Sequence, residues 1–385
     1  MGQCAHRPAA ARRPDELRNT RRAGSWLGRL ARRLGTALLF IVVAICFAPT
    51  LVPPFLDRIY YEGPAGNHYN GERFFNPGFG EYRGGDPRGF LNRWANGDRA
   101  EWPEHVPVRQ TAPPRRVEGS DMRVTWIGHA TVLVQTQGLN ILTDPIWSQR
   151  ASPFAFAGPK RVRAPGVRFE DLPKIDAVLI SHNHYDHMDL PTLKRLWERD
   201  RPKIVTSLGN DTILRGKGIV SVALDWNGRS GLGNGASVII ERNHHWGSRW
   251  GTDRNRALWS AFTVELPGGN VFFAGDTGIG DGSWVSEAAA RGPFRLAIIP
   301  IGAYEPRDFM KTNHINPEEA VAIFKALNPT GALGIHWGTF QLTFEGIDEP
   351  RQRLAALRRQ HGIAENRFVA VEAGQNFAVP ARAAP

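Results

Sequence analysis

The sequence predicts an α/β protein in which a sheet-rich core is covered by helices. After Met122, short apolar and β-branched runs are bounded by Gly, Pro or Asp, as is typical of strands. Helical patterns fall between some of these runs, and this alternation favours sheets with helices packed on them. The chain is 42% hydrophobic and 22% charged, with 12 Trp and 20 Phe, which is enough apolar material for a full core. One large domain with accessory segments accounts for the 385 residues.

Residues 1–33 form a basic tail. They hold nine Arg against Asp15 and Glu16, so that +7 of the net charge of +11 lies in this tail. A nucleic-acid-binding protein would carry its basic charge on the folded domain, so this class is excluded. The only cysteines are Cys4 and Cys46, which leaves the predicted catalytic region without a disulfide or a Cys-based zinc site.

The run from Leu34 to Val52 is apolar and contains no charge over nineteen residues, so it is predicted to be a single transmembrane helix. The positive-inside rule then places the basic tail in the cytoplasm. In a bacterium, the rest of the chain would lie in the periplasm, anchored to the inner membrane. A buried helix or a cleaved signal peptide is the alternative, although Pro49 after Ala48 disfavours cleavage.

Residues 53–119 are predicted to be a linker and a wrapping segment, because Gly, Pro and aromatic residues dominate them without a sustained period. We expect no catalytic group there. Residues 120–375 are the predicted catalytic domain, and residues 376–385 a C-terminal tail. Strands are predicted at 122–127, 131–136, 140–144, 177–181, 203–207, 219–223, 236–241, 261–266, 270–275, 296–301 and 332–336, and helices at 190–201, 283–291, 317–327 and 350–360.

The strongest chemical signal is the run His182–His187, which reads HNHYDH directly after a predicted strand. Imidazole nitrogens and carboxylate oxygens are ligands that suit zinc. Three His and one Asp within six residues exceed what one tetrahedral ion readily takes from a short loop, so two ions are predicted. His245, Asp276 and His336 each follow an apolar strand, where a loop at a sheet end would present the remaining ligands.

These residues resemble the metallo-β-lactamase fold, and more narrowly the branch that contains N-acylphosphatidylethanolamine-hydrolysing phospholipase D. The resemblance is carried, between Val124 and Phe340, by VTWIGHATVLV, ILTDPIWSQRASP, DAVLISHNHYDHMD, FFAGDTG, IPIGAYEPRDFMKTNHINPEEA and IHWGTF. It implies a four-layer αββα sandwich, preceded here by the transmembrane helix, with a binuclear zinc site at one edge of the sheets.

The resemblance also implies the ligand set. One Zn²⁺ would be held by His182, His184 and His245, the other by Asp186, His187 and His336, and Asp276 would bridge both. Two such ions can share a hydroxide and lower its pKa towards neutrality. Beside His245 stands His244, but the Trp that follows His245 matches the family, and in an extended stretch His244 would point the other way.

Asp186 and His314 are the catalytic candidates. By resemblance, His314 faces the substrate phosphate, and Tyr185 and Phe156 also contact substrate; packing roles for His314 and Tyr185 stay open. His129 is expected to support a ligand rather than bind metal. The mammalian family member has a Gln-Tyr pair where this chain has Ala155-Phe156, which leaves acyl selectivity open. The connection 147–169 is aromatic and basic, so it could meet an anionic lipid headgroup, or it could be an ordinary solvated loop.

The resulting hypothesis is a zinc-dependent phosphodiesterase of the phospholipase D type that acts on N-acylphosphatidylethanolamine or a related glycerophospholipid. The alternative is a metal-dependent lactonase or another small-ester hydrolase of the same fold. A binding protein that has lost the chemistry is a third reading, and the seven filled ligand positions argue against it. The expected partners are a phospholipid substrate and the bilayer, and a homodimer is left open.

Overall fold

The computed structural model describes residues 26, 28–44, 58–78 and 87–381. The chain divides into two compact units, Met1–Arg58 and Ile59–Pro385. In the first unit, residues 28–44 are helical and their side chains are exposed. Residues 45–52 of the predicted transmembrane segment lie outside the described residues. Within the described ranges, no helix has both the length and the apolar character that crossing a membrane requires, so the predicted anchor finds no support there.

The second unit contains two mixed sheets of seven strands each. The first sheet has the order β14-β1-β2-β3-β4-β5-β6. Its strands are β1 (Met122–Gly128), β2 (Thr131–Thr136), β3 (Leu139–Thr143), β4 (Ala177–Ile180), β5 (Lys203–Ser207), β6 (Val222–Leu224) and β14 (Asn376–Ala378). Strands β14, β1, β2 and β3 pair antiparallel, whereas β3 to β6 pair parallel.

The second sheet has the order β13-β12-β11-β10-β9-β8-β7. Its strands are β7 (Arg229–Gly233), β8 (Ala236–Glu241), β9 (Ala261–Glu265), β10 (Asn270–Phe273), β11 (Phe294–Pro300), β12 (Gly331–Ile335) and β13 (Phe368–Val369). Strands β7 to β10 pair antiparallel and β10 to β13 pair parallel. Each sheet therefore repeats one pattern, an antiparallel meander followed by parallel strands.

Alternation along the strands divides the apolar side chains between two cores. In β4, Ala177 and Leu179 join the large core that both sheets share, while Val178 and Ile180 join a second core with α4 (Leu190–Asp200). Helix α5 (Asn210–Arg215) adds Leu214 to that second core. The two sheets therefore face each other, as the predicted sandwich requires, and the first sheet carries helices on its other face.

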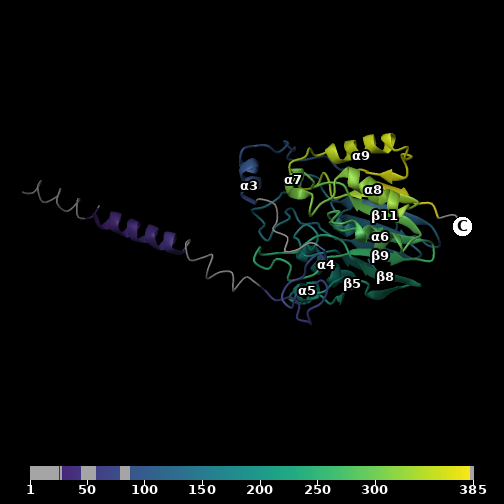
Figure 1. Ribbon diagram of the computed structural model, residues 1–385, viewed down its shortest axis with the longest axis horizontal. Helices are drawn as coiled ribbons and strands as arrows, with labels where there is room; N and C mark the ends of the chain where they lie inside the picture. Colours follow the sequence, from purple (N-terminus) through teal and green to yellow (C-terminus); the bar gives the residue numbers. More distant parts are fainter. Residues whose placement is uncertain (1–25, 27, 45–57, 79–86, 382–385) are drawn as a thin grey trace, which may run out of the picture. The chain divides into compact units, whose positions relative to one another are not determined.

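The second sheet is covered by its own helices. Helix α8 (Pro317–Leu327) packs on β11, and α6 (Ser283–Ala289) and α9 (Glu349–Gln360) pack on α8 (Figure 1). Helix α8 begins with a capping box in which Asn316 and Glu319 bond each other's backbone N–H groups, and Pro317 occupies its first turn. These local signals explain why its predicted bounds, 317–327, agree with the structure.

The other predicted elements are present, with small shifts at their ends. The predicted strand at 219–223 is displaced, because β6 begins only at Val222. Several short elements were not predicted: β7, β13, β14, α3 (Pro87–Ala95), α5, α7 (Arg307–Met310) and the 3₁₀ turn η1 (Phe169–Asp171). Strand β14 begins inside the predicted C-terminal tail and pairs with β1. Strand β7 reads RSGLG, so its extended form comes from pairing with β8 and not from its own side chains.

The described part of the wrapping segment, 58–78, packs on the second unit's surface. Tyr69 and Phe74 form a small core with Leu258 and Trp259, and the Phe74 N–H donates to the Asn255 carbonyl over 2.8 Å. Residues 59–78 thus belong to the second unit.

Candidate metal centre

The structure brings all seven predicted metal ligands together at the ends of strands from both sheets. The loop after β4 carries His182, His184, Asp186 and His187, and the residues after β8, β10 and β12 carry His245, Asp276 and His336. The buried donor atoms of these residues fall into overlapping groups in which all atoms lie within 4.8 Å of one another. The structure therefore brings the seven residues to a common edge, and their role as metal ligands stays a prediction.

One group of donors is made of imidazole nitrogens. His182 Nε2 lies 2.8 Å from His184 Nδ1, and His245 Nε2 lies 3.4 Å from the same atom. Asp276 Oδ2 lies 4.0 Å from His245 Nε2. Asp276 Oδ1 and His184 Nε2 are buried and make no hydrogen bond to the described residues. A buried carboxylate with a free oxygen beside three imidazoles is suited to a cation.

A second group combines two imidazoles and two carboxylates. His187 Nε2 lies 3.3 Å from both His336 Nε2 and Asp186 Oδ2. Asp276 Oδ2 lies 3.0 Å from His187 Nε2 and 3.1 Å from His336 Nε2. Asp186 Oδ2 and His336 Nε2 are 3.5 Å apart. Neighbouring ligands of a tetrahedral zinc ion are separated by about 3.3 Å. Five distances between these four atoms are 3.0–3.5 Å, so the donors are close enough together to share a metal ion.

The two groups differ in charge. Burial and the neighbouring imidazoles lower the pKa of His182 well below its usual value, and burial lowers the pKa of His184 to about 3. Burial also acts on His187 and His336, but Asp276 and Asp186 outweigh it: the pKa of His187 rises well above its usual value and that of His336 rises to about 9. The imidazoles of the first group are therefore neutral. In the second group, His187 and His336 carry protons that the neighbouring carboxylates stabilise, and a metal cation must displace these protons.

Asp144 fixes the tautomers of one histidine in each group, a role that the sequence analysis did not assign. Asp144 lies just after β3, fully buried, and its Oδ2 accepts from His187 Nδ1 over 2.6 Å and from Ser181 Oγ over 2.5 Å. Because that hydroxyl donates to Asp144, it accepts from His182 Nδ1, 2.8 Å away. In their neutral forms, both imidazoles thus present an unprotonated Nε2 to the cluster. The sequence feature that could have indicated this role is the position of Asp144 at the end of the predicted strand 140–144.

Backbone strain is concentrated beside the ligands. His129 and His336 have φ values of 55° and 64°, which non-glycine residues adopt rarely, and the His336 N–H donates to the His129 carbonyl over 3.0 Å. A Cβ on Gly302 would stand 2.2 Å from the His336 carbonyl oxygen, so only glycine fits there. The His129 side chain donates to Asp186 Oδ2 over 2.8 Å, and it therefore supports a ligand, as expected.

His314 and Tyr185 lie beside the cluster and are partly exposed, and the His314 donor atom falls in one group with those of His245 and Asp276. His314 Nδ1 lies 3.9 Å from Asp276 Oδ2, and burial lowers its pKa to about 4, so the ring is neutral and able to donate a hydrogen bond. Tyr185 packs under the guanidinium of Arg249, 3.9 Å from the ring centre. Arg249 also donates to the carbonyls of Asn183 and Met188, each over 3.0 Å, and so fastens both ends of the ligand loop.

The wrapping segment supports the cluster, although no catalytic group was expected there. Asn76 Nδ2 donates to the His245 carbonyl over 2.9 Å, and Trp259 Nε1 donates to Asn76 Oδ1 over 3.2 Å. His245 Nδ1 donates to the Asn313 carbonyl, which leaves its Nε2 for the cluster. The choice of His245 over His244 agrees with this geometry, because His244 is absent from the groups of donor atoms found among the described residues.

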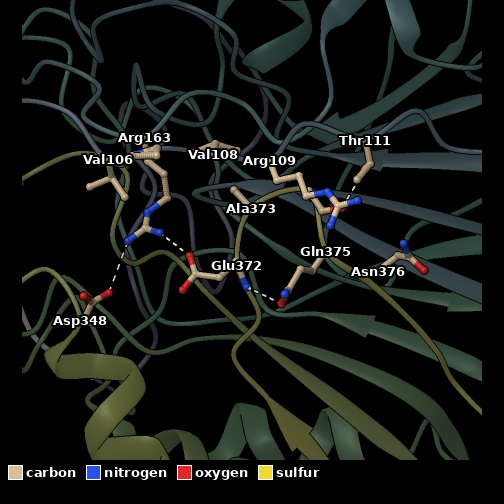
Figure 2. Close-up of a pocket in the computed structure, with 12 residues that line it drawn as sticks. Val106, Val108, Arg109, Thr111, Arg163, Asp348, Glu372, Ala373, Gln375 and Asn376 are labelled. Carbon is tan, nitrogen blue, oxygen red and sulfur yellow. Dashed lines mark hydrogen bonds and ion pairs between the residues drawn. The ribbon is translucent and has the colours of Figure 1, made fainter.

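A cavity of about 810 Å³ lies apart from the seven ligands, and Figure 2 shows its lining. The guanidinium of Arg163 is buried at one side of it and pairs with Asp348 and Glu372. Arg163 also donates to the Gly338 carbonyl over 3.0 Å and lies over the Trp337 ring. This arginine therefore braces the turn that follows the ligand His336. Phe156, predicted to contact substrate, is 81% exposed and packs on Phe154, so that role stays a prediction.

Two facing mixed sheets with a buried His and Asp cluster at their strand ends define a metal-dependent hydrolase of the metallo-β-lactamase fold. Residues 139–337 match the family model described as "Beta-lactamase superfamily domain", and the chain belongs to this superfamily. Within it, the chain is 37% identical to N-acyl-phosphatidylethanolamine-hydrolyzing phospholipase D 1 of Caenorhabditis elegans, over 80% of this chain and 92% of the relative.

Further relatives agree with this assignment. The mitochondrial N-acyl-phosphatidylethanolamine-hydrolyzing phospholipase D of Saccharomyces cerevisiae is 33% identical over 64% of this chain and 54% of its own length. Among solved structures, an isothiocyanate hydrolase from Delia radicum gut bacteria superposes with a TM-score of 0.52 at 20% identity, over 67% of this chain and 99% of that one. That structural likeness shows the shared fold alone.

Proposed function

We propose that this hydrolase is a zinc-dependent phosphodiesterase of the phospholipase D type, acting on N-acylphosphatidylethanolamine or a related glycerophospholipid. The observation that carries the proposal is the close grouping of Asp186, His187, Asp276 and His336 beside the imidazole group of His182, His184 and His245. Nitrogen and carboxylate oxygen donors without thiolates are a ligand set that zinc accepts. The similarity to relatives named for this lipid activity supports the substrate class.

In this proposal, seven residues would hold two Zn²⁺ ions, with Asp276 between the two groups. When bound, the ions supply Lewis acidity that activates water and offsets charge on phosphate oxygens. The chain's own residues orient the reactants. Neutral His314, which is partly exposed, would donate a hydrogen bond to a phosphoryl oxygen and so stabilise the charge that develops in the transition state. Asp186 is held in position by His129.

The test compares the wild type with Asp276→Asn. We expect the wild type to contain about two zinc ions per chain and to release phosphatidic acid from N-acylphosphatidylethanolamine in mixed micelles, and Asp276→Asn to lose both metal and turnover. Asp281→Asn is the matched control, because the Asp281 carboxylate accepts hydrogen bonds from Ser283 and lies outside the donor groups. Metal-replete protein that releases no phosphatidic acid, yet hydrolyses lactones or short esters, would assign the alternative function instead.

We also propose that the N-terminal segment anchors the protein in the inner membrane with the hydrolase unit in the periplasm. The proposal rests on the uncharged run 34–52 and on the nine Arg that precede it. Carbonate extraction of membranes should leave the full chain in the pellet, and protease added to spheroplasts should digest the hydrolase unit. Release of the chain by carbonate, or protection from the protease, would contradict the anchor or its orientation respectively.

A further inference from the structure

An exposed apolar tip stands on the connection that follows β3. Phe156 is 81% and Phe154 50% exposed, and their ring centres are 5.5 Å apart. Pro153 and Ala155 beside them are exposed as well. Residues 153–156, here called the PFAF tip, are therefore four consecutive apolar residues in water. Such a contiguous patch on an otherwise well-buried fold is a feature of interaction surfaces.

The PFAF tip is supported by an ordered stem, which consists of residues 150–151 and 159–160. Arg150 and Lys160 form an antiparallel bridge, and the Ala151 N–H donates to the Pro159 carbonyl over 3.1 Å. Inside the loop, the Arg150 guanidinium donates to the carbonyls of Ala155 over 3.2 Å and Gly158 over 2.6 Å. These hydrogen bonds are made within the loop, and the two rings remain exposed.

The stem is tied to the edge that carries the metal cluster. Arg161, next to the stem, lies over the Phe340 ring at 4.7 Å, and Phe340 meets the His129 ring edge-on at 5.3 Å. His129 in turn bonds the ligand Asp186. The topology agrees: β3 and β4 are parallel, so the loop that bears the tip and the loop that bears the ligands leave the sheet at the same edge.

We propose that the PFAF tip inserts into the interface of a phospholipid bilayer and turns the metal-bearing edge towards the lipid surface. The inference rests on the proposed function, because it gives a partner to the same site. Two aromatic rings suit the depth of headgroups and upper acyl chains, and no charge interrupts the segment between Arg150 and Lys160. Lys160 is exposed at the base of the loop, where anionic headgroups would lie once the rings are inserted.

The test reads the environment of the tip itself, so that binding through the basic tail cannot imitate insertion. In the full chain with Cys4→Ser and Cys46→Ser, Ala155→Cys is labelled with an environment-sensitive fluorophore, which leaves both rings in place. Val220→Cys is the matched control: Val220 is 67% exposed and apolar, but it precedes the parallel strand β6 and so lies at the opposite edge of the sheet. The probes are vesicles of phosphatidylcholine with and without phosphatidylglycerol.

We expect a blue shift at position 155 and none at position 220, with a larger shift on vesicles that contain phosphatidylglycerol. Replacing Phe154 and Phe156 by Ser should reduce the inserted population on the order of tenfold for each ring. Equal shifts at both positions, or no shift at position 155 on vesicles that bind the protein, would overturn the inference. A shift that needs no vesicles and grows with protein concentration would overturn it too, since a second copy would then cover the tip.

The outcomes also separate this inference from the proposed function. If the tip inserts but phosphatidic acid is never released, the insertion of the PFAF tip is supported and the proposed phospholipase activity is rejected. If phosphatidic acid is released from the same vesicles while position 155 stays in water, the proposed phospholipase activity is supported and the insertion of the PFAF tip is rejected.

Discussion

The role of Asp144 makes a quantitative prediction. In Asp144→Asn, the amide oxygen can still accept from the Ser181 N–H, which donates to Asp144 Oδ1 over 2.7 Å. The amide NH₂ would then face the His187 Nδ1–H, 2.6 Å away in the wild type. Two donors cannot pair, so the imidazole must shift its proton to Nε2, the atom that faces the metal cluster. Losing one hydrogen bond to a charged group costs about 1.5–3 kcal/mol, and we expect roughly 10- to 100-fold weaker metal binding.

Metal affinity of this variant is measured by competition with a chromophoric chelator, with circular dichroism to verify folding. Asp189→Asn is the matched control, because Asp189 is also buried but accepts from Trp147, Ser148 and Thr192 instead of a ligand histidine. The control should lose stability while keeping its metal affinity. Wild-type metal affinity in Asp144→Asn would refute the argument that Asp144 fixes the tautomer of His187.

Three further predictions concern the support of the cluster. Arg249→Lys should weaken metal binding several-fold, since an ammonium group cannot span two carbonyls and stack on an aromatic ring as a guanidinium does. The control is Arg254→Lys, which alters a cation that packs on Trp246 and should leave the zinc content, measured by elemental analysis, unchanged. Asn76→Ala should lower the free energy of unfolding in urea by about 1–2 kcal/mol, because the His245 carbonyl loses its donor; an unchanged midpoint would contradict the contact. Chelation of the metal should lower the Tm, because an ion that binds only the folded chain stabilises it; a Tm insensitive to chelator and to added zinc would contradict a contribution of the metal to stability.

The sequence was informative where local patterns and function coincide. His182 to His187 lie within one short loop, so their shared site could be predicted from spacing, and His245, Asp276 and His336 could be placed because each follows a strand. Non-local support could not be predicted this way. Asp144 acts through a histidine 43 residues away, and nothing in its neighbours marks that partner.

The same limit applies to the fold. The long amphipathic pattern and the capping residues of α8 are local, and its bounds were predicted correctly. Strand β7 is rich in glycine and β13 has two residues, so neither carries a periodic pattern of its own, and each is extended because a neighbouring strand pairs with it. The Asn76 contact joins residues 169 positions apart and depends on how the wrapping segment packs.

The division of the ligands between the two sheets has a consequence for biosynthesis. Translation delivers His182 to His187 first, then His245 and Asp276, and His336 only after β12 has been made. A nascent chain that ends after β6 therefore holds four of the seven donors and lacks Asp276, the carboxylate that lies between the two groups. High-affinity metal binding therefore requires that nearly the whole chain has left the ribosome. A bound ion would indicate that both sheets have folded and packed together.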